Sequence, residues 1–181
     1  EWDDETSLIS RLFTGDPINP TSDIRYGYDS FERMNYVQVL RQNGEPVNQE
    51  TYYAYNSNDL LTEIILPNGV LGKYSYDDSG QLEKLVYEDA SGNILSSYLY
   101  TLDDLGRRTR IETFNGTETK TIDYTYDELG RLVKEDINNG TQTIEYTYDE
   151  VGNRLTRLDS ETGLTSYTYD KSDRLTAQIS G

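Results

Sequence analysis

The stretch YTYDELGRL (residues 124–132) returns as YTYDEVGNRL (residues 146–155) and, in a diverged form, as YTYDKSDRL (residues 167–175). A chain needs an active site once, whereas a motif that recurs along its length describes how the chain is built. Aligned on the residue after the second tyrosine, the copies lie 21 to 27 residues apart, with an average of about 23.5. A period in this range predicts supersecondary units stacked in one direction. The seven aligned positions are Asp29, Asn56, Asp77, Asp103, Asp127, Asp149 and Asp170.

The segments that end in these tyrosines alternate with period two. In residues 141–148, Ile144, Tyr146 and Tyr148 fall on one face, and the threonines and glutamate between them fall on the other. This pattern is typical of a β-strand with one aromatic and one polar face. The fourth copy is irregular, because Leu102 takes the place before Asp103 and the tyrosines come two residues earlier. We expect the tyrosines to stack across neighbouring strands, where such pairs contribute roughly 0.2 to 1 kcal/mol each.

Two kinds of turn separate the strands. DDSG, DDLG, DELG and DEVG follow the tyrosines and place an aspartate at the start of a turn and a glycine at its end. Aspartate can accept backbone N–H bonds there, and glycine adopts positive φ without steric cost. Pairs such as Asn68-Gly69 and Asn139-Gly140 lie between the motifs and are strong hairpin signals. The chain from about Ile24 is therefore predicted to be all-β: roughly a dozen antiparallel strands in tandem hairpin repeats, forming one elongated, curved sheet without a globular core.

The composition limits the classes of function. The 181 residues carry 16 basic and 33 acidic side chains, a net charge of -17, and this surface disfavours binding to nucleic acids and anionic membranes. The chain has no cysteine and no histidine, so the usual zinc sites and the histidine-based nucleophile pairs are excluded. Tyrosine is abundant, with 17 residues against three phenylalanines, and it suits thin structures because its ring is buried while its hydroxyl stays hydrogen-bonded. No apolar run approaches the roughly 20 residues of a membrane span.

Carboxylates are the remaining candidates for catalysis or metal binding. Asp77 with Asp78, or Asp103 with Asp104, resembles the paired acids of glycosidases, but an acid occupies the same position in six of the seven copies. We therefore expect no catalytic residues, and local backbone bonding explains the aspartates better than a calcium site does. No cofactor or metal is expected. Four arginines recur near the turns, and we expect them to pair with acids on neighbouring strands rather than to bind anions; they are Arg107, Arg131, Arg154 and Arg174.

The tandem motif, with Asn-Gly turns between its copies, resembles the YD repeats of the RHS/YD-repeat family over about residues 24–177. That family includes bacterial Rhs and wall-associated polymorphic toxins, toxin-complex C components and animal teneurins. The resemblance implies a spiralling antiparallel sheet that is an open fragment of a β-shell, and such a shell can enclose a toxic domain. The residues for which it implies a structural role in the repeat are Tyr74, Tyr76, Asp77, Gly80, Asp103, Gly106, Arg107, Tyr124, Tyr126, Asp127, Gly130, Arg131, Tyr146, Tyr148, Asp149, Gly152, Tyr167, Tyr169 and Asp170.

The chain departs from the family pattern in several places. Asn56 replaces an aspartate, and no glycine ends the turn after Asp29, Asn56 or Asp170. Asp16-Pro17 is followed by Ile18 and not by the family's Asp-Pro-x-Gly signature. The resemblance therefore implies no self-cleavage for this segment.

The expected organisation is a lead-in at residues 1–23 followed by about seven repeats as one domain at residues 24–181. We expect an irregular or strand-like lead-in. The alternative is a short helix with Asp4 as its N-cap and with Leu8, Ile9, Leu12 and Phe13 on one stripe. Because the chain starts with Glu1 and not methionine, we expect it to be a piece of a longer protein.

The resemblance implies a non-enzymatic structural segment of a secreted or surface-exposed bacterial protein. Its expected partners are neighbouring repeats and an enclosed toxin or adhesive domain. The alternative is a module that binds glycans or a cell-surface receptor through exposed tyrosines, since periodicity alone does not show which face is covered. We expect no nucleic-acid partner and no membrane insertion. Unpaired strands at both ends would also allow end-to-end self-association.

Overall fold

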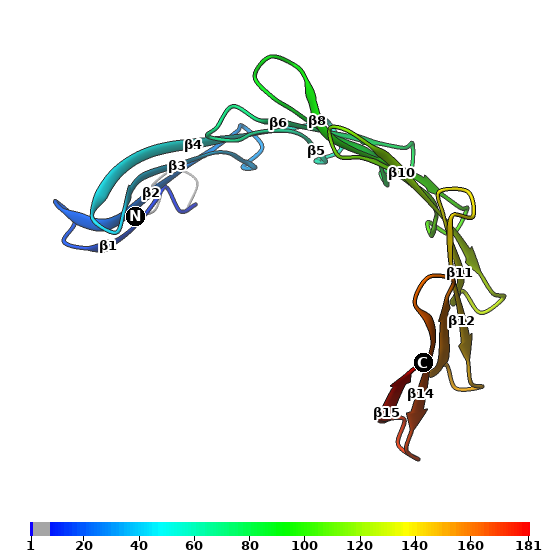
Figure 1. Ribbon diagram of the computed structural model, residues 1–181. Coiled ribbons are helices and arrows are strands. Elements are labelled where there is room, and N and C mark those ends of the chain that lie inside the picture. Colours follow the sequence, from blue (N-terminus) through cyan, green and yellow to red (C-terminus); the bar gives the residue numbers. More distant parts are fainter. Residues whose placement is uncertain (2–7) are drawn as a thin grey trace. The chain divides into compact units, whose positions relative to one another are not determined.

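The computed structural model describes residues 1 and 8–181, which form antiparallel strands and no helix (Figure 1). The strands follow one another in sequence order, each paired with the next, so that the sheet is an open meander. This arrangement confirms the predicted all-β fold of tandem hairpins. No helix in the described part of the chain is long and apolar enough to cross a membrane. The strands are β1 (Arg11–Gly15), β2 (Pro20–Tyr28), β3 (Met34–Gln42), β4 (Glu45–Tyr55), β5 (Leu61–Ile65), β6 (Leu71–Tyr76), β7 (Leu82–Glu88), β8 (Ile94–Leu102), β9 (Arg108–Phe114), β10 (Thr119–Tyr126), β11 (Leu132–Ile137), β12 (Gln142–Tyr148), β13 (Arg154–Asp159), β14 (Gly163–Tyr169) and β15 (Leu175–Ser180).

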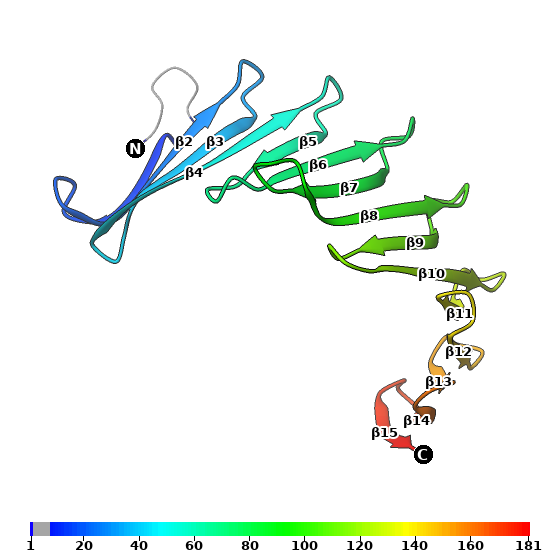
Figure 2. The same ribbon diagram turned by 45° about the horizontal axis from the view of Figure 1, so that its top comes forward.

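The chain divides into two compact units, residues 1–96 and 97–181. In the first unit, β2 to β7 lie side by side in sequence order, as Figure 2 shows. In the second unit, β9 to β15 repeat this order. Every even-numbered strand ends in a motif and is called here a tyrosine strand. The five-residue turn that starts at one of the seven aligned Asp or Asn positions is called an Asp turn. Every odd-numbered strand from β3 onward follows an Asp turn and is called a return strand.

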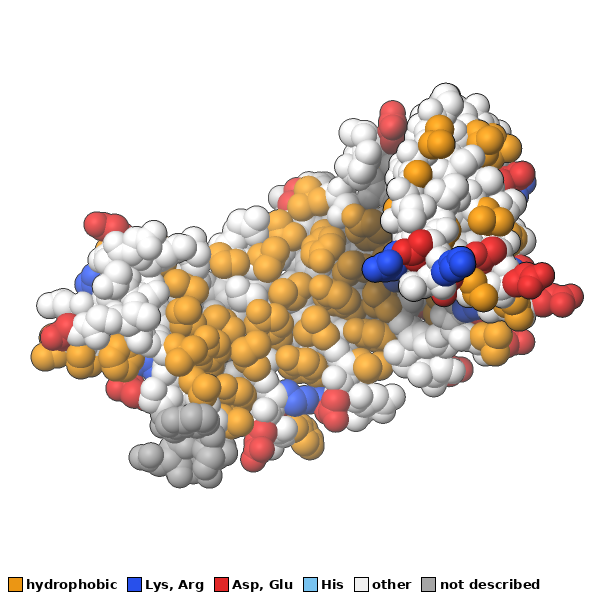
Figure 3. Space-filling model, turned by 90° about the horizontal axis from the view of Figure 1, so that it is seen from below, with side chains coloured by type: hydrophobic (Ala, Val, Ile, Leu, Met, Phe, Trp, Pro, Cys, Tyr) orange, Lys and Arg blue, Asp and Glu red, His pale blue; other side chains and the backbone are white. Residues whose placement is uncertain are grey.

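The sheet is a single layer. Only a few apolar side chains of the described residues are buried, namely Val86, Ile137, Ile144 and Tyr167, and none is completely excluded from solvent. In the second unit, Ile122 lies opposite Ile137 and Ile144 lies opposite Glu135, so these residues share a face with the motif tyrosines. Figure 3 shows apolar side chains, with the tyrosines counted among them, gathered on one broad face of the first unit. The absence of a deep core in the described part of the chain agrees with the predicted thin sheet.

A β-bulge recurs in every pair of a tyrosine strand and its return strand. The register shifts immediately before the last residue of the tyrosine strand, for example between Thr125 and Tyr126 and between Thr147 and Tyr148. The shift is also present in the irregular copy, between Thr101 and Leu102. In each case the return strand contributes one extra residue, such as Val133 between Leu132 and Lys134. Bulges re-aim side chains and increase local twist, and here each one immediately precedes the last residue of a tyrosine strand.

The segment expected as a lead-in contains β1, and β2 begins at Pro20, before Ile24. Leu12, placed on the apolar stripe of the alternative helix, lies in β1 opposite Ile24. Asp4, the proposed N-cap, lies outside the described residues. The division into a lead-in at 1–23 and one repeat domain at 24–181 remains a prediction.

Candidate functional site: the junctions between repeats

Each Asp turn is organised around one side-chain oxygen. In the fifth turn, Asp127 Oδ1 accepts hydrogen bonds from the backbone N–H groups of Leu129 (3.0 Å) and Arg131 (2.9 Å). The Gly130 N–H donates to the Asp127 carbonyl at 2.9 Å and closes the turn. The backbone hydrogen bond from Arg131 is the main cause that holds the pKa of Asp127 below its ordinary value. The side chains of Asp29, Asn56, Asp77, Asp103, Asp149 and Asp170 accept the same pair of backbone bonds.

The turns without glycine keep the same geometry. Gly130 and Gly152 have φ of 78° and 99°, and Glu32, Asp59 and Asp173 occupy the equivalent position with φ of 62°, 61° and 58°. Asp is among the residues that tolerate this conformation, whereas Glu32 is strained there. The departures from the motif noted in the sequence therefore alter the side chain and not the turn.

An arginine links one Asp turn to the next repeat. Arg131 Nε donates to Asp127 Oδ2 at 2.7 Å within its own turn, and Arg131 Nη1 donates to the carbonyl of Asp149 at 3.0 Å. Its guanidinium carbon lies 4.9 Å from the centroid of the Tyr148 ring, a cation–π distance. Arg107 stacks on Tyr126 in the same way, at 4.8 Å. We call this contact between an Asp turn and the tyrosine strand of the following repeat a repeat junction.

The second tyrosine of each motif completes the repeat junction through its hydroxyl. Tyr148 Oη donates to the carbonyl of Leu132 at 2.7 Å, at the point where the return strand β11 leaves the Asp turn. The equivalent bonds run from Tyr55 to Met34, from Tyr76 to Leu61, from Tyr126 to Arg108, and from Tyr169 to Arg154, and Tyr28 donates to Ile9. Five of these phenols therefore bond to the first residue of the preceding strand, and Ile9, the acceptor of Tyr28, lies two residues before β1.

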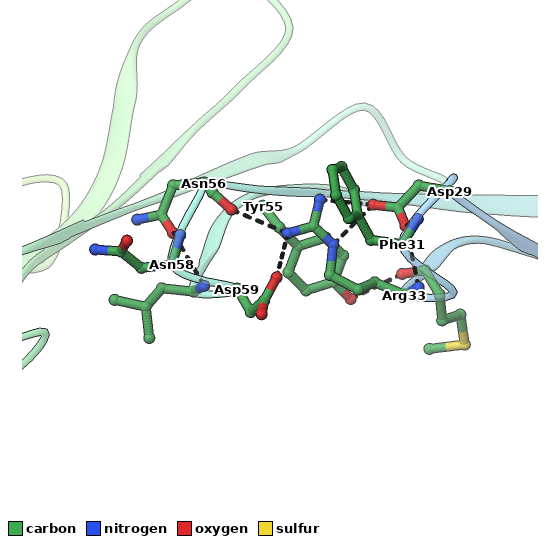
Figure 4. Close-up of polar contacts among 9 residues, drawn as sticks. Asp29, Phe31, Arg33, Tyr55, Asn56, Asn58 and Asp59 are labelled. Atoms are coloured by element: carbon green, nitrogen blue, oxygen red, sulfur yellow. Dashed lines mark hydrogen bonds and ion pairs between the residues drawn. The ribbon is translucent and has the colours of Figure 1, made fainter.

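The junction between the first and second repeats is the most elaborate (Figure 4). Arg33 donates to Asp29 in its own turn, and its Nη1 donates to the carbonyl of Asn56 at 2.9 Å and to Asp59 Oδ1 at 2.7 Å. Its guanidinium lies 4.9 Å from the centroid of the Tyr55 ring. Asn153 makes an equivalent pair of bonds, to Asp149 and Asp173, both at 2.9 Å. An aspartate at the left-handed turn position thus gives the preceding repeat an additional acceptor.

Two expectations about side-chain partners are wrong. The motif tyrosines do not stack on one another: the ring pair found among the described residues is Tyr36 with Tyr52, 5.3 Å apart, and neither belongs to a motif. The rings of Tyr55, Tyr126 and Tyr148 instead lie against an arginine of the preceding Asp turn. Three arginines pair with the acid four residues earlier in their own turn and not with a neighbouring strand, in the pairs Arg107–Asp103, Arg131–Asp127 and Arg174–Asp170. The fourth, Arg154, lies over the ring of Tyr167 at 4.4 Å.

The first tyrosines of three motifs, Tyr74, Tyr146 and Tyr167, lie in protected positions. Tyr146 Oη donates to Glu135 Oε1 at 2.5 Å, and burial, followed by this carboxylate, raises the pKa of Tyr146 to about 12. Burial and the neighbouring Tyr87 raise the pKa of Tyr74 to about 12. Tyr167 is buried under Arg154. The phenols of Tyr74 and Tyr146 therefore stay protonated, as hydrogen-bonding groups, at neutral pH.

One turn between the motifs, at Ser91-Gly92, has the same side-chain cap as the Asp turns. Asp89 Oδ1 accepts from the N–H groups of Ser91 (2.8 Å) and Asn93 (2.9 Å), and Gly92 donates to the Asp89 carbonyl. This turn joins β7 to β8, at the opposite end of the strands from the Asp turns. The sequence predicts a turn at Ser91-Gly92, but the aspartate cap was missed because no tyrosine motif precedes Asp89.

The arrangement offers no distinctive catalytic group among the described residues. Asp77 and Asp103 are occupied as turn acceptors, and their neighbours Asp78 and Asp104 are exposed. Nowhere in the described part of the chain do three or more acidic side chains gather in a way that could hold a metal ion. The chemistry of the repeat junctions is that of hydrogen bonding and cation–π contact.

Two family models match the chain. The teneurin YD-shell model matches residues 90–179, and the RHS repeat model matches residues 55–93. The chain belongs to the YD-repeat, or RHS-repeat, family. Its repeats are of the kind that builds shells, so this YD-repeat chain is a structural repeat segment. A comparison with curated protein sequences found no match.

Two solved structures show the same fold. A chain of the TcdB2-TccC3-Cdc42 crystal structure aligns with 97% of this chain at a TM-score of 0.74 and 16% identity. A chain of the Photorhabdus luminescens Tc holotoxin pore aligns with 92% at a TM-score of 0.71 and 18% identity. The YD-repeat segment spans 10% of the length of each of these chains.

Proposed function

We propose that this chain is a non-enzymatic wall segment of a larger secreted or surface-exposed bacterial YD-repeat protein. In that protein it would form part of a shell that encloses or presents a toxin or adhesive domain. Its immediate partners would be further repeats on either side. The likeness to chains of toxin complexes supports this proposal at the level of the fold.

The observation that carries the proposal is the recurrence of the repeat junction. Five tyrosine hydroxyls donate to the preceding strand and a sixth donates to Ile9 just before β1, at distances of 2.7 to 3.0 Å. Seven turns share one side-chain-capped geometry, and none of them is set apart by a unique group. A wall needs the same contact at every step, whereas a catalytic site needs a single arrangement of groups.

Cryo-electron microscopy of the complete protein encoded by the parent gene tests the proposal. We expect this segment to lie in the wall of a hollow shell, with further repeats on both sides and additional density inside. Protease treatment of the intact particle should spare the enclosed domain and cleave it once the shell is denatured. A solid particle, or a segment displayed outside any shell, would contradict the proposal.

A second candidate function is glycan or receptor binding, favoured by the aromatic pair outside the motifs. Tyr52 is 43% exposed, stacks at a tilt on Tyr36, and donates to Glu50 Oε2 at 2.8 Å. An exposed ring beside a carboxylate is suited to the apolar face and hydroxyl groups of a sugar. Glycan-array binding that is lost in Tyr52→Ala and kept in the motif variant Tyr148→Phe would favour this function.

A further inference from the structure

The Asn-Gly pairs of the chain differ in the hydrogen bonds that hold them. In such a pair the glycine nitrogen can attack the side-chain amide carbon of the asparagine, because glycine has no side chain that crowds the attack. Hydrogen bonds that fix the amide or the glycine N–H oppose this reaction. The pairs lie between strands and are Asn43-Gly44, Asn68-Gly69, Asn115-Gly116 and Asn139-Gly140.

The pairs at residues 68 and 115 are held by capping bonds. Asn68 Oδ1 accepts from the backbone N–H two residues further on at 3.2 Å, and the Gly69 N–H donates to the Leu66 carbonyl at 2.9 Å. Asn115 Oδ1 accepts from the backbone N–H groups two and three residues further on, at 3.0 and 2.9 Å. These bonds must break before either amide carbon can be attacked.

Asn43 and Asn139 share a backbone conformation and differ in their bonds. Their φ angles are 53° and 54°, and those of the glycines that follow are 84° and 87°. The Gly44 N–H donates to the Thr21 carbonyl at 2.7 Å. Among the described residues, no hydrogen-bond partner is found for the Asn139 side chain or for the Gly140 N–H, and both residues are exposed.

The φ of Asn139 is also the one that ring closure requires. A five-membered succinimide ring fixes ψ of the asparagine near about −120°, and this ψ with a φ of about +60° describes the first central residue of a type II′ turn. Rotation of the single peptide group between Asn139 and Gly140 produces this geometry. Gly140 accepts either sign of φ, and even a Cβ added there would meet nothing within 4 Å.

The residues on either side anchor the turn while that peptide group rotates. The Asn138 N–H donates to the Thr121 carbonyl, and Asn138 Oδ1 accepts from the Thr121 N–H, both at 2.9 Å. Thr141 Oγ1 donates to the Asn138 carbonyl at 3.0 Å. The turn between β11 and β12 is therefore anchored around the one peptide group that the reaction has to move.

We propose that Asn139-Gly140 is a site of succinimide-mediated modification in the folded chain. The Gly140 nitrogen forms a bond to Asn139 Cγ, its proton passes through solvent to the amide nitrogen, and the amide C–N bond breaks to release ammonia. Water then opens the succinimide at either of its carbonyls and leaves aspartate or isoaspartate. One water is consumed, and nothing is oxidised or reduced. A neutral amide becomes a carboxylate, so the net charge of -17 becomes one unit more negative.

The modification changes a hairpin and leaves the repeat junction intact. Isoaspartate adds one methylene group to the main chain between β11 and β12. The hydrogen bond from Tyr148 to the Leu132 carbonyl lies at the other end of these two strands. The inference therefore goes beyond the proposed wall function and does not depend on it.

Incubation of the intact folded chain at mildly alkaline pH, followed by peptide mapping with mass spectrometry, tests the proposal. We expect Asn139 to be modified at least about fivefold faster than Asn43, because the peptide group before Gly44 loses a hydrogen bond when it rotates. Modification at Asn68 and Asn115 should also be slower than at Asn139. In concentrated urea the protecting bonds are absent, and the Asn-Gly pairs should react at similar rates.

Asn139→Gln is the blocking variant, because cyclisation of glutamine requires a less favourable six-membered ring. Isoelectric focusing of the folded variant should lose the early shift of one negative charge. Asn43→Gln is the matched control and should keep this shift, since it removes the pair that has the same backbone conformation.

Equal rates at the Asn-Gly pairs of the folded chain, faster modification at another pair, or an Asn139 that stays unmodified would each overturn the inference. Each of these results would leave the proposed function standing, because the imaging of the complete protein tests that function independently.

Discussion

Single residues at the turn position decide how closely two repeats approach. An added Cβ at Gly130 would meet Arg107 Nη1 at 3.3 Å, whereas one at Gly152 would meet nothing within 4 Å. Both glycines have positive φ, so alanine at either site costs about 1–2 kcal/mol from backbone strain alone. We predict that Gly130→Ala is the more destabilising variant, because it also displaces the Arg107 guanidinium. Urea denaturation of the two variants measures their free energies of unfolding. Equal losses of this free energy would show that the contact between position 130 and Arg107 has no energetic effect.

The tyrosine hydroxyl and the arginine are predicted to act on the same repeat junction. Tyr148→Phe removes the donor to the Leu132 carbonyl and should cost about 1 kcal/mol. Arg131→Gln keeps a polar side chain and removes the cation above the Tyr148 ring. In a double-mutant cycle with Tyr148→Leu, we expect a coupling energy of about 0.5–1 kcal/mol. Additive losses would mean that the two side chains do not stabilise each other.

At the scale of the strands and turns, the sequence predicts the order of elements well. Period-two alternation and glycine spacing mark each hairpin, because one face and one turn conformation are required at every step. The bulges were not predictable, since a register shift depends on which residue of the partner strand lies opposite, and no local signal marks Val133 as the extra one. The partners of Arg107 and Arg131 were missed for the same reason: the tyrosine that each contacts is 17 to 19 residues away in the sequence.

Close packing between strands is visible only in the structure. A Cβ at Gly72 in β6 would lie 2.7 Å from Ile64 Cγ2 and 3.0 Å from Tyr87 Cε1, on the two neighbouring strands. Gly72 has no positive φ, so the cost of Gly72→Ala is one of overpacking, about 1–3 kcal/mol. Thermal denaturation should show this loss, and combining the change with Ile64→Ala should recover part of it. A fully additive double variant would indicate that the sheet relaxes elsewhere.

For the whole molecule, the phenols predict an alkaline limit of stability. The pKa values of Tyr74 and Tyr146 are raised to about 12, chiefly by burial, and burial also raises those of Tyr55, Tyr124 and Tyr148. Because these pKa values are higher in the folded chain than in the unfolded chain, ionisation of the phenols favours unfolding. The stability that the protonated phenols contribute is complete below about pH 10 and is lost as the pH rises toward about 12. We expect tyrosinate absorbance and loss of β-sheet circular dichroism to rise together in this interval. Ionisation without unfolding would show that the hydroxyl donors are dispensable.

The net charge of -17 governs how copies of the chain meet. Charge repulsion acts over roughly 8 Å at physiological salt and is screened further as salt is added. Among the described strands, β15 has a backbone edge without a partner strand, whereas Glu1 bonds to the backbone of Ser10 and Arg11 at the outer edge of β1. We predict a monomer at low salt and end-to-end association at high salt or high protein concentration. Because β1 offers no tyrosine to Arg174, this association should be the same in Arg174→Gln. Sedimentation velocity across a salt series measures this association. A monomer under all conditions would show that the strand edges are protected. A loss of association in Arg174→Gln would show that the arginine contacts β1.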